Sequence, residues 1–251
     1  MDFAREGSGP VVVLIPGLGC DHRLWRPVGR RLAERHTVVY PRTWGTGSIR
    51  AAAEGVVSVL DAVGAREAAV AGLSMGGYVT FELLRHHAER LWAVALVDTT
   101  PFGDTPDRRS KRDQVLRLIE RGEFDAVLGT YAESVLAPHN ARGPLRDLLV
   151  DMGRTIGPEA FARDVAAIRD RGHYEDVLPS IRVPTLFASG ELDGLTPPEL
   201  AHRAAERVPG ARVAVVPGAG HMTPIEAPEA LAQILSDFLD QTAPNAGSRE
   251  P

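Results

Sequence analysis

The feature that most constrains the fold is a regular alternation of short apolar runs with longer amphipathic stretches, which stops once and then resumes. In the first part of the chain, the apolar runs predict strands at residues 11–15, 38–40, 68–73 and 92–97. Apolar residues at helical spacing predict helices between them, at 22–34, 49–63 and 75–87. Strands and helices that alternate at this interval are typical of a parallel sheet with right-handed crossovers.

The alternation stops between residues 101 and 180, where the sequence predicts helices and no strand. These helices are expected near 107–121, 123–136, 144–155 and 158–170. After Pro184 the alternation returns, with strands at 185–188 and 213–216 and helices at 198–208 and 228–239. A sheet that is interrupted once predicts one core, residues 1–100 and 181–240, with a helical lid, residues 101–180, inserted into it. We expect the polar tail, 241–251, to be disordered.

Composition and charge exclude several classes of protein. The chain has 251 residues with 28 basic and 33 acidic side chains, whereas a nucleic-acid-binding protein needs a concentrated positive face. The single cysteine, Cys20, excludes an intramolecular disulfide and a zinc site with four thiolate ligands. No early apolar run approaches the roughly 20 residues that span a bilayer, and residues 1–7 do not resemble a secretory signal. We therefore expect a soluble cytoplasmic protein without nucleic-acid or membrane partners.

The motif with the most chemical content is Gly72-Leu-Ser-Met-Gly76. A G-x-S-x-G pattern is weak alone, but this one lies between a predicted strand and a predicted helix, where a nucleophile elbow is found. The serine of such an elbow sits on a sharp turn, so the residues two positions away must lack side chains. The N-terminus of the helix also favours negative charge that develops at the serine. Ser74 is therefore the candidate nucleophile.

An activated serine needs a base, and the base needs an acid that orients it. Among eight histidines, His221 lies in a loop directly after a late predicted strand. Asp193 follows the preceding predicted strand and is the first candidate for the acid. Asp98, at the end of the fourth predicted strand, is a rival that would face the same edge of the sheet, and Glu191 is a weaker one.

The order Ser74, Asp193, His221 resembles that of the α/β-hydrolase fold superfamily, and the resemblance extends over residues 2–240 apart from the lid. It is carried by the elbow and by three further segments, 3–19, 190–197 and 218–228. It implies a mostly parallel α/β-hydrolase sheet flanked by helices, with these three residues as a catalytic triad. It also implies an oxyanion hole formed by the backbone N–H groups of Leu18 and Met75.

Two loops depart from the pattern of that superfamily. Pro16 stands where a histidine is usual, so the bonding that braces the oxyanion loop must come from elsewhere, with His22 or Asp21 as candidates. Arg42 replaces the aspartate of a loop that usually reads Asp-x-x-Gly-x-Gly, which leaves the role of that loop open. Cys20 lies beside the oxyanion loop without a base of its own, and we expect it to be a buried filler.

The resemblance implies a serine hydrolase that cleaves a small-molecule ester, lactone or thioester through an acyl-enzyme on Ser74. Enol-lactone hydrolases, small carboxylesterases and cofactor-free haloperoxidases or perhydrolases are resembled about equally well. A non-catalytic ligand-binding protein of the same fold is a further alternative. No dinucleotide-binding or P-loop motif appears, so we expect no cofactor, and no metal. Side chains that could line a substrate pocket beneath the lid are Trp25, Trp44, Phe102, Tyr131, Tyr174 and Met222.

Overall fold

The computed structural model describes residues 1–243, and its centre is a seven-stranded sheet with the order β1-β3-β2-β4-β5-β6-β7. The strands are β1 (Phe3–Glu6), β2 (Val11–Ile15), β3 (Thr37–Pro41), β4 (Ala68–Leu73), β5 (Leu91–Val97), β6 (Thr185–Gly190) and β7 (Arg212–Val216). Every neighbouring pair is parallel except β1 and β3, which are antiparallel at one edge. The predicted mostly parallel sheet is confirmed.

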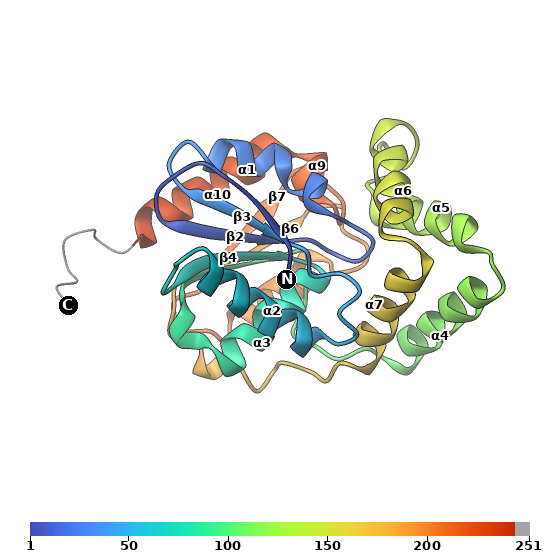
Figure 1. The fold of residues 1–251 in the computed structure, drawn as a ribbon, viewed down its shortest axis with the longest axis horizontal. Helices are drawn as coiled ribbons and strands as arrows, with labels where there is room; N and C mark the ends of the chain where they lie inside the picture. The colour runs from blue at the N-terminus through green and yellow to red at the C-terminus, as the bar shows by residue number, and fades with distance from the viewer. Residues whose placement is uncertain (244–251) are drawn as a thin grey trace.

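The central strands β4, β5 and β6 are buried along their whole length. Helices cover both faces of a parallel sheet, so its inner strands read as continuous apolar runs rather than as an alternation. One face is covered by α1 (Arg26–Leu32) and α10 (Pro228–Thr242), and the other by α2 (Ile49–Ala62) and α3 (Met75–His86) (Figure 1). The helices α8 (Pro198–Ala205) and α9 (Thr223–Glu226) complete the core.

One predicted helix, 22–34, is divided in the structure. A 3₁₀ turn spans His22–Leu24, and α1 begins only at Arg26, with Pro27 in its first turn. Proline is favoured in the first turn of a helix because its missing N–H would have no partner there. The turn has its own N-cap, Asp21, whose carboxylate accepts from Arg23 N at 2.9 Å.

The insert predicted between the two parts of the sheet is present and helical. It contains α4 (Pro106–Glu120), α5 (Phe124–Val135), α6 (Pro144–Ile156) and α7 (Pro158–Asp170). Figure 1 shows these four helices gathered at one side of the sheet. The chain leaves after β5 and returns before β6, and these two strands are direct neighbours, with Val94 in register with Thr185. The lid is therefore an excursion between adjacent strands, made near the edge where the loops after the parallel strands lie.

Most of the predicted tail, 241–251, lies outside the described residues, which end at Ala243. Gln241 and Thr242 form the end of α10.

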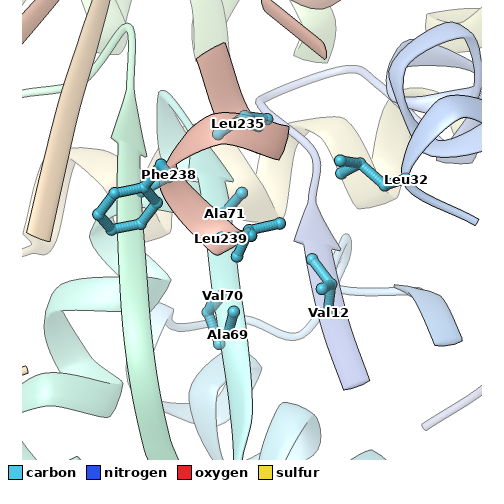
Figure 2. Close-up of a pocket in the computed structure, with 9 residues that line it drawn as sticks. Val12, Leu32, Ala69, Val70, Ala71, Leu235, Phe238 and Leu239 are labelled. Atoms are coloured by element: carbon cyan, nitrogen blue, oxygen red, sulfur yellow. The ribbon is translucent and has the colours of Figure 1, made fainter. Parts of the chain in front are cut away.

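On its inner face α10 packs against the sheet around a cavity of about 10 Å³ (Figure 2). That volume is about the minimum for one water molecule, and an apolar lining offers such a water no partner. The cavity is lined by Val12, Leu32, Ala69, Val70, Ala71, Ala95, Leu235, Phe238 and Leu239. Within residues 1–243, no helix is long and apolar enough to cross a membrane.

Candidate active site

Ser74 forms the elbow between β4 and α3 in a conformation that few side-chain-bearing residues adopt, with φ of 52° and ψ of −109°. Its backbone is held on both sides. Ser74 N donates to the carbonyl of Val97 at 3.0 Å, and the Thr99 hydroxyl donates to the Ser74 carbonyl at 2.8 Å. The surrounding bonds therefore stabilise a strained turn that presents the Ser74 hydroxyl at the end of the strand.

The glycines of the motif are required by the closeness of three backbones. A Cβ on Gly72 would clash with the carbonyl of Gly76, and a Cβ on Gly76 would clash with the carbonyl of Ile15 in β2. These obstacles are backbone atoms, so a side chain there could be accommodated only by moving the strand or the helix. The structural context that the sequence predicted for this motif, a turn from strand to helix, is confirmed.

Two loops after late strands bring a histidine and a carboxylate to Ser74. The acid loop, residues 191–197, follows β6, and the histidine loop, residues 217–222, follows β7. His221 Nε2 lies 2.9 Å from Ser74 Oγ, and His221 Nδ1 lies 2.8 Å from Asp193 Oδ2. The imidazole therefore bridges the hydroxyl and the carboxylate, which is the geometry of a nucleophile, a general base and an orienting acid.

Asp193 is prepared to remain ionised. Its Oδ1 accepts from the amides of Leu195 and Thr196 at 2.8 and 2.9 Å, and its Oδ2 accepts from the Thr196 hydroxyl at 2.7 Å. Burial alone would raise the pKa of this carboxyl, but the charge and hydrogen bond of His221 and the bonds from Thr196 lower it to about 2. A charged acceptor is therefore held against His221 Nδ1.

The basicity of His221 results from two opposing effects. Burial favours the neutral imidazole and would lower its pKa, whereas the charge and hydrogen bond of Asp193 raise it. The net effect is a pKa above the ordinary value of 6.5. The guanidinium of Arg108, on the lid helix α4, acts in the opposite direction and lowers this pKa.

The rival acid Asp98 has a different set of partners. It is fully buried, with a φ of 45°, and accepts from Gly190 N at 2.8 Å and from the Thr223 hydroxyl at 2.7 Å. Burial and the charge of Asp193 raise the pKa of Asp98 to about 8. The carboxyl thus ties the end of β6 to the start of α9. Glu191, the weaker rival, accepts from Gly218 N at 2.8 Å.

The two amides predicted to form an oxyanion hole, those of Leu18 and Met75, belong to segments that lie beside Ser74. Leu18 lies in the oxyanion loop, residues 16–21, after β2, and Met75 is the first residue of α3. A Cβ on Gly17 would lie 3.4 Å from the Cβ of Ser74, so this loop passes directly beside the serine. Within residues 1–243, neither amide donates a hydrogen bond to another group of the protein. Both donors are thus available to a bound group.

The oxyanion loop is braced by the lid. The hydroxyl of Tyr131, on α5, donates to the Leu18 carbonyl at 2.9 Å, and a Cβ on Gly19 would lie 2.7 Å from the ring of Phe161 on α7. Asp21, a candidate brace in the sequence, instead accepts from Arg23, whose guanidinium continues to Asp151 on α6. The bracing role of Tyr131 was missed, because no local motif links residues so far apart along the chain.

The candidate pocket residues are dispersed. Trp25 is fully buried, and its indole N–H donates to the Ile15 carbonyl at 2.9 Å, so its polar group is used within the core. The ring of Trp44 lies 5.4 Å from the guanidinium of Arg42, and that of Phe102 lies 4.5 Å from the guanidinium of Arg203. These centroid distances allow cation–π attraction.

The remaining candidates also lie in different places. Met222 is fully buried beside His221, whereas the Tyr174 ring stacks on Phe81 at 5.2 Å. Cys20 is fully buried, and burial raises the pKa of its thiol, which makes it a poor nucleophile. Among residues 1–243, no three histidine, cysteine or acidic side chains are grouped so as to hold a metal ion.

Comparison with known proteins supports the same architecture. The sequence matches the alpha/beta hydrolase family over residues 12–234. It is 33% identical to the polyketide synthase ThaQ of Burkholderia thailandensis, in an alignment that covers 96% of the chain but 12% of that protein. A thermophilic esterase from Thermogutta terrifontis, solved with malate bound, is 26% identical with a TM-score of 0.90, and 96% and 93% of the two chains are covered. The enol-lactonase from Burkholderia xenovorans is 25% identical with a TM-score of 0.86, covering 95% and 96%. The chain is a member of the alpha/beta hydrolase family.

Proposed function

We propose that the protein is a serine hydrolase that cleaves a small-molecule ester, lactone or thioester through an acyl-enzyme on Ser74. The observation that carries this proposal is the position of His221, within hydrogen-bond distance of both Ser74 Oγ and Asp193 Oδ2. The similarity to an esterase and to an enol-lactonase supports ester and lactone substrates in particular.

In the first half of the reaction, Ser74 Oγ attacks the carbonyl carbon while His221 Nε2 takes the hydroxyl proton. Asp193 holds the Nδ1 tautomer and stabilises the imidazolium that forms. The carbonyl oxygen becomes an oxyanion, and the N–H groups of Leu18 and Met75 donate to it. His221 then gives its proton to the oxygen or sulfur of the leaving group, which departs as an alcohol or a thiol. The acyl group remains on Ser74 as an ester.

In the second half, His221 takes a proton from a water molecule, whose oxygen attacks the acyl carbon. The same two amides stabilise the second oxyanion, and the proton returns to Ser74 Oγ as the carboxylic acid departs. Removal of a single donor from such a hole typically lowers kcat by about 10²–10³-fold. Backbone donors cannot be removed by substitution. The role of the Leu18 amide can instead be tested by removing the Tyr131 hydroxyl, which bonds to the Leu18 carbonyl from the lid.

The proposal is tested by Ser74→Ala, with Ser58→Ala as the matched control, because Ser58 is exposed on α2. We expect Ser74→Ala to fold and to lose about 10⁴–10⁶-fold in the hydrolysis of activated esters. A fluorophosphonate should label the parent and the control but not Ser74→Ala. If the parent were labelled without catalysing repeated ester hydrolysis, the protein would be a ligand-binding member of the fold instead. Equal hydrolysis by Ser74→Ala and the parent would reject the mechanism.

A further inference from the structure

Glu226, the last residue of α9, accepts four hydrogen bonds through its side chain and has no part in the mechanism above. Its Oε1 accepts from the amides of Gly220 at 3.0 Å and Met222 at 3.1 Å. These are the residues on either side of His221. The carboxylate therefore holds the histidine loop at both neighbours of the base.

The other oxygen of the same carboxylate is bonded to the lid. Glu226 Oε2 accepts from the amide of Ala137 at 2.8 Å and from the side-chain amide of Asn140 at 3.0 Å. Both donors lie shortly after α5, in the segment 136–143 that connects α5 to α6. A single carboxylate thus bridges the lid and the loop that carries the proposed base.

Two neighbouring contacts reinforce this bridge. His221 N donates to the carbonyl of Val135, the last residue of α5, at 2.9 Å. A Cβ on Gly220 would clash with Ala137 N, so the histidine loop and the lid touch through their backbones. The side chain of His221 faces Ser74 while its own backbone is held by the lid.

A carboxylate suits this place for a chemical reason. It offers about four acceptor positions and no donor, and Glu226 uses all four on N–H groups. Hydrogen bonds to an ionised acceptor are roughly twice as strong as neutral ones. The three backbone donors are partly buried, so removal of the carboxylate leaves them without a partner, which is costlier than the loss of an exposed bond.

We propose that Glu226 is a positioning residue that aligns His221 with Ser74 and makes this alignment depend on the seating of the lid. The inference rests on the proposed function, since it assigns His221 the role of the base. Glu226 itself touches neither the serine nor the site of attack. Its effect passes through the backbone on either side of the imidazole.

The first experiment compares Glu226→Gln, Glu226→Ala and Asn140→Ala with Glu229→Gln, an exposed carboxylate three residues further on. Since a displacement of about 1 Å can cost 10²-fold in rate, we expect Glu226→Ala to lower kcat by about 10²-fold with KM nearly unchanged. Glu226→Gln keeps one acceptor oxygen and should lose less. Asn140→Ala removes only the side-chain bond to the lid and should lose about 3–10-fold, the value of one hydrogen bond. Glu229→Gln should match the parent.

The second experiment separates positioning from general stability. In a His221→Ala background, Glu226→Gln should cause no further loss of rate, because residues that act as a unit are not additive. A full additional loss in the double variant would overturn the proposal, as would kcat values for Glu226→Gln and Glu226→Ala equal to that of Glu229→Gln. If Glu226→Ala does not fold, Glu226→Gln and Asn140→Ala carry the test alone.

A third measurement does not depend on hydrolysis. The Nδ1 proton of His221, shared with Asp193, is observable by proton NMR at low field in the parent without substrate. We expect this signal to shift or broaden in Glu226→Gln and Asn140→Ala and to be unchanged in Glu229→Gln. An unchanged signal in both of the former would reject the positioning role. A parent that hydrolyses no ester but shows the shift would reject the proposed function and leave the positioning role supported.

Discussion

The sheet and the lid are stabilised in different ways. The strands β4, β5 and β6 are buried from end to end, whereas α4 has no buried residue at all. Lid helices are joined across their surfaces by ion pairs such as Arg146–Glu133 at 2.9 Å and Arg154–Asp125 at 2.8 Å. Exposed pairs of this kind contribute little to stability. The central sheet is therefore buried as a whole, whereas burial among the lid helices α4 to α7 is confined to parts of α5, α6 and α7.

The lid makes specific hydrogen bonds where it meets the loops that carry the proposed catalytic groups. Each of the three loops is bonded to the lid: the oxyanion loop to Tyr131, the acid loop to Arg108 through the Leu195 carbonyl, and the histidine loop to Val135. The base of the lid also contains a buried ion pair, Asp104–Arg171, at 3.1 Å. Reactive groups are thus supplied by the sheet, while their support comes partly from the lid.

The largest effect should arise within the sheet, between two buried carboxylates. We expect Asp193→Asn to lower kcat by about 10⁴-fold, because the imidazole loses its tautomer and its counter-charge. Asp98→Asn should cost less than about tenfold, since Asp98 bonds to Gly190 and Thr223 rather than to His221. Steady-state kinetics at pH 7 checks both. If kcat fell more in Asp98→Asn than in Asp193→Asn, then Asp98 would be the acid of the triad.

The next effect tests whether the lid alters the chemistry of the sheet. A protonated His221 cannot act as a base, so kcat/KM should fall about tenfold per pH unit below its pKa, with a midpoint above 6.5. Arg108 lowers that pKa, so Arg108→Gln should move the midpoint to higher pH. Arg109→Gln, at an exposed neighbour, is the control. Identical pH profiles for the parent and Arg108→Gln would show that the lid has no electrostatic influence.

A pair of glycine substitutions compares how closely the backbone is packed in the two regions. In Gly76→Ala the new Cβ meets the Ile15 backbone, and we expect the free energy of unfolding to fall by about 3 kcal/mol or more. In Gly153→Ala, on α6, the three atoms nearest to the new Cβ are side-chain carbons of Leu128, which can move more easily than a backbone. Alanine is more favourable than glycine in a helix by about 1 kcal/mol, and this gain should nearly offset the cost of moving the Leu128 side chain. Thermal unfolding measures both, and equal losses would contradict the contrast between sheet and lid.

The smallest effect concerns a single bond between the regions. Tyr131→Phe removes only the hydroxyl that donates to the Leu18 carbonyl. One neutral hydrogen bond contributes about 0.5–1.5 kcal/mol, so we expect kcat to fall about 3–10-fold with little change in KM. Ser134→Ala, exposed on the same helix, should leave kcat unchanged. A change in KM alone would mean that Tyr131 contacts the substrate rather than the loop.

The sequence predicted the sheet and the elbow well because their constraints are local. Strands buried on both faces must be apolar throughout, and a turn as tight as that at Ser74 requires glycine at Gly72 and Gly76. The sequence favoured Asp193 over Asp98 but left the rival open, because both follow parallel strands at the same edge of the sheet. Their hydrogen bonds distinguish them, because Asp193 bonds to His221 whereas Asp98 bonds to Gly190 and Thr223.

The contribution of the lid could not be predicted for a related reason. The bond from Tyr131 to Leu18 and the bonds from Ala137 and Asn140 to Glu226 join residues more than eighty positions apart, and no spacing pattern indicates these partners. The aromatic candidates for the pocket were chosen by residue type alone. Trp25 shows the weakness of that choice, since its indole N–H is bonded to the Ile15 carbonyl inside the core.

The pairing of β5 with β6 across the whole insert has a consequence for biosynthesis. A ribosome makes the elbow and the oxyanion loop first, then the lid, and only afterwards the strands that carry Asp193 and His221. The nucleophile therefore exists in the nascent chain long before its base. Under the proposed mechanism, the growing chain lacks its general base until β6 has paired with β5 and the histidine loop has been made. Hydrolysis in a translation reaction would thus report the completion of the sheet.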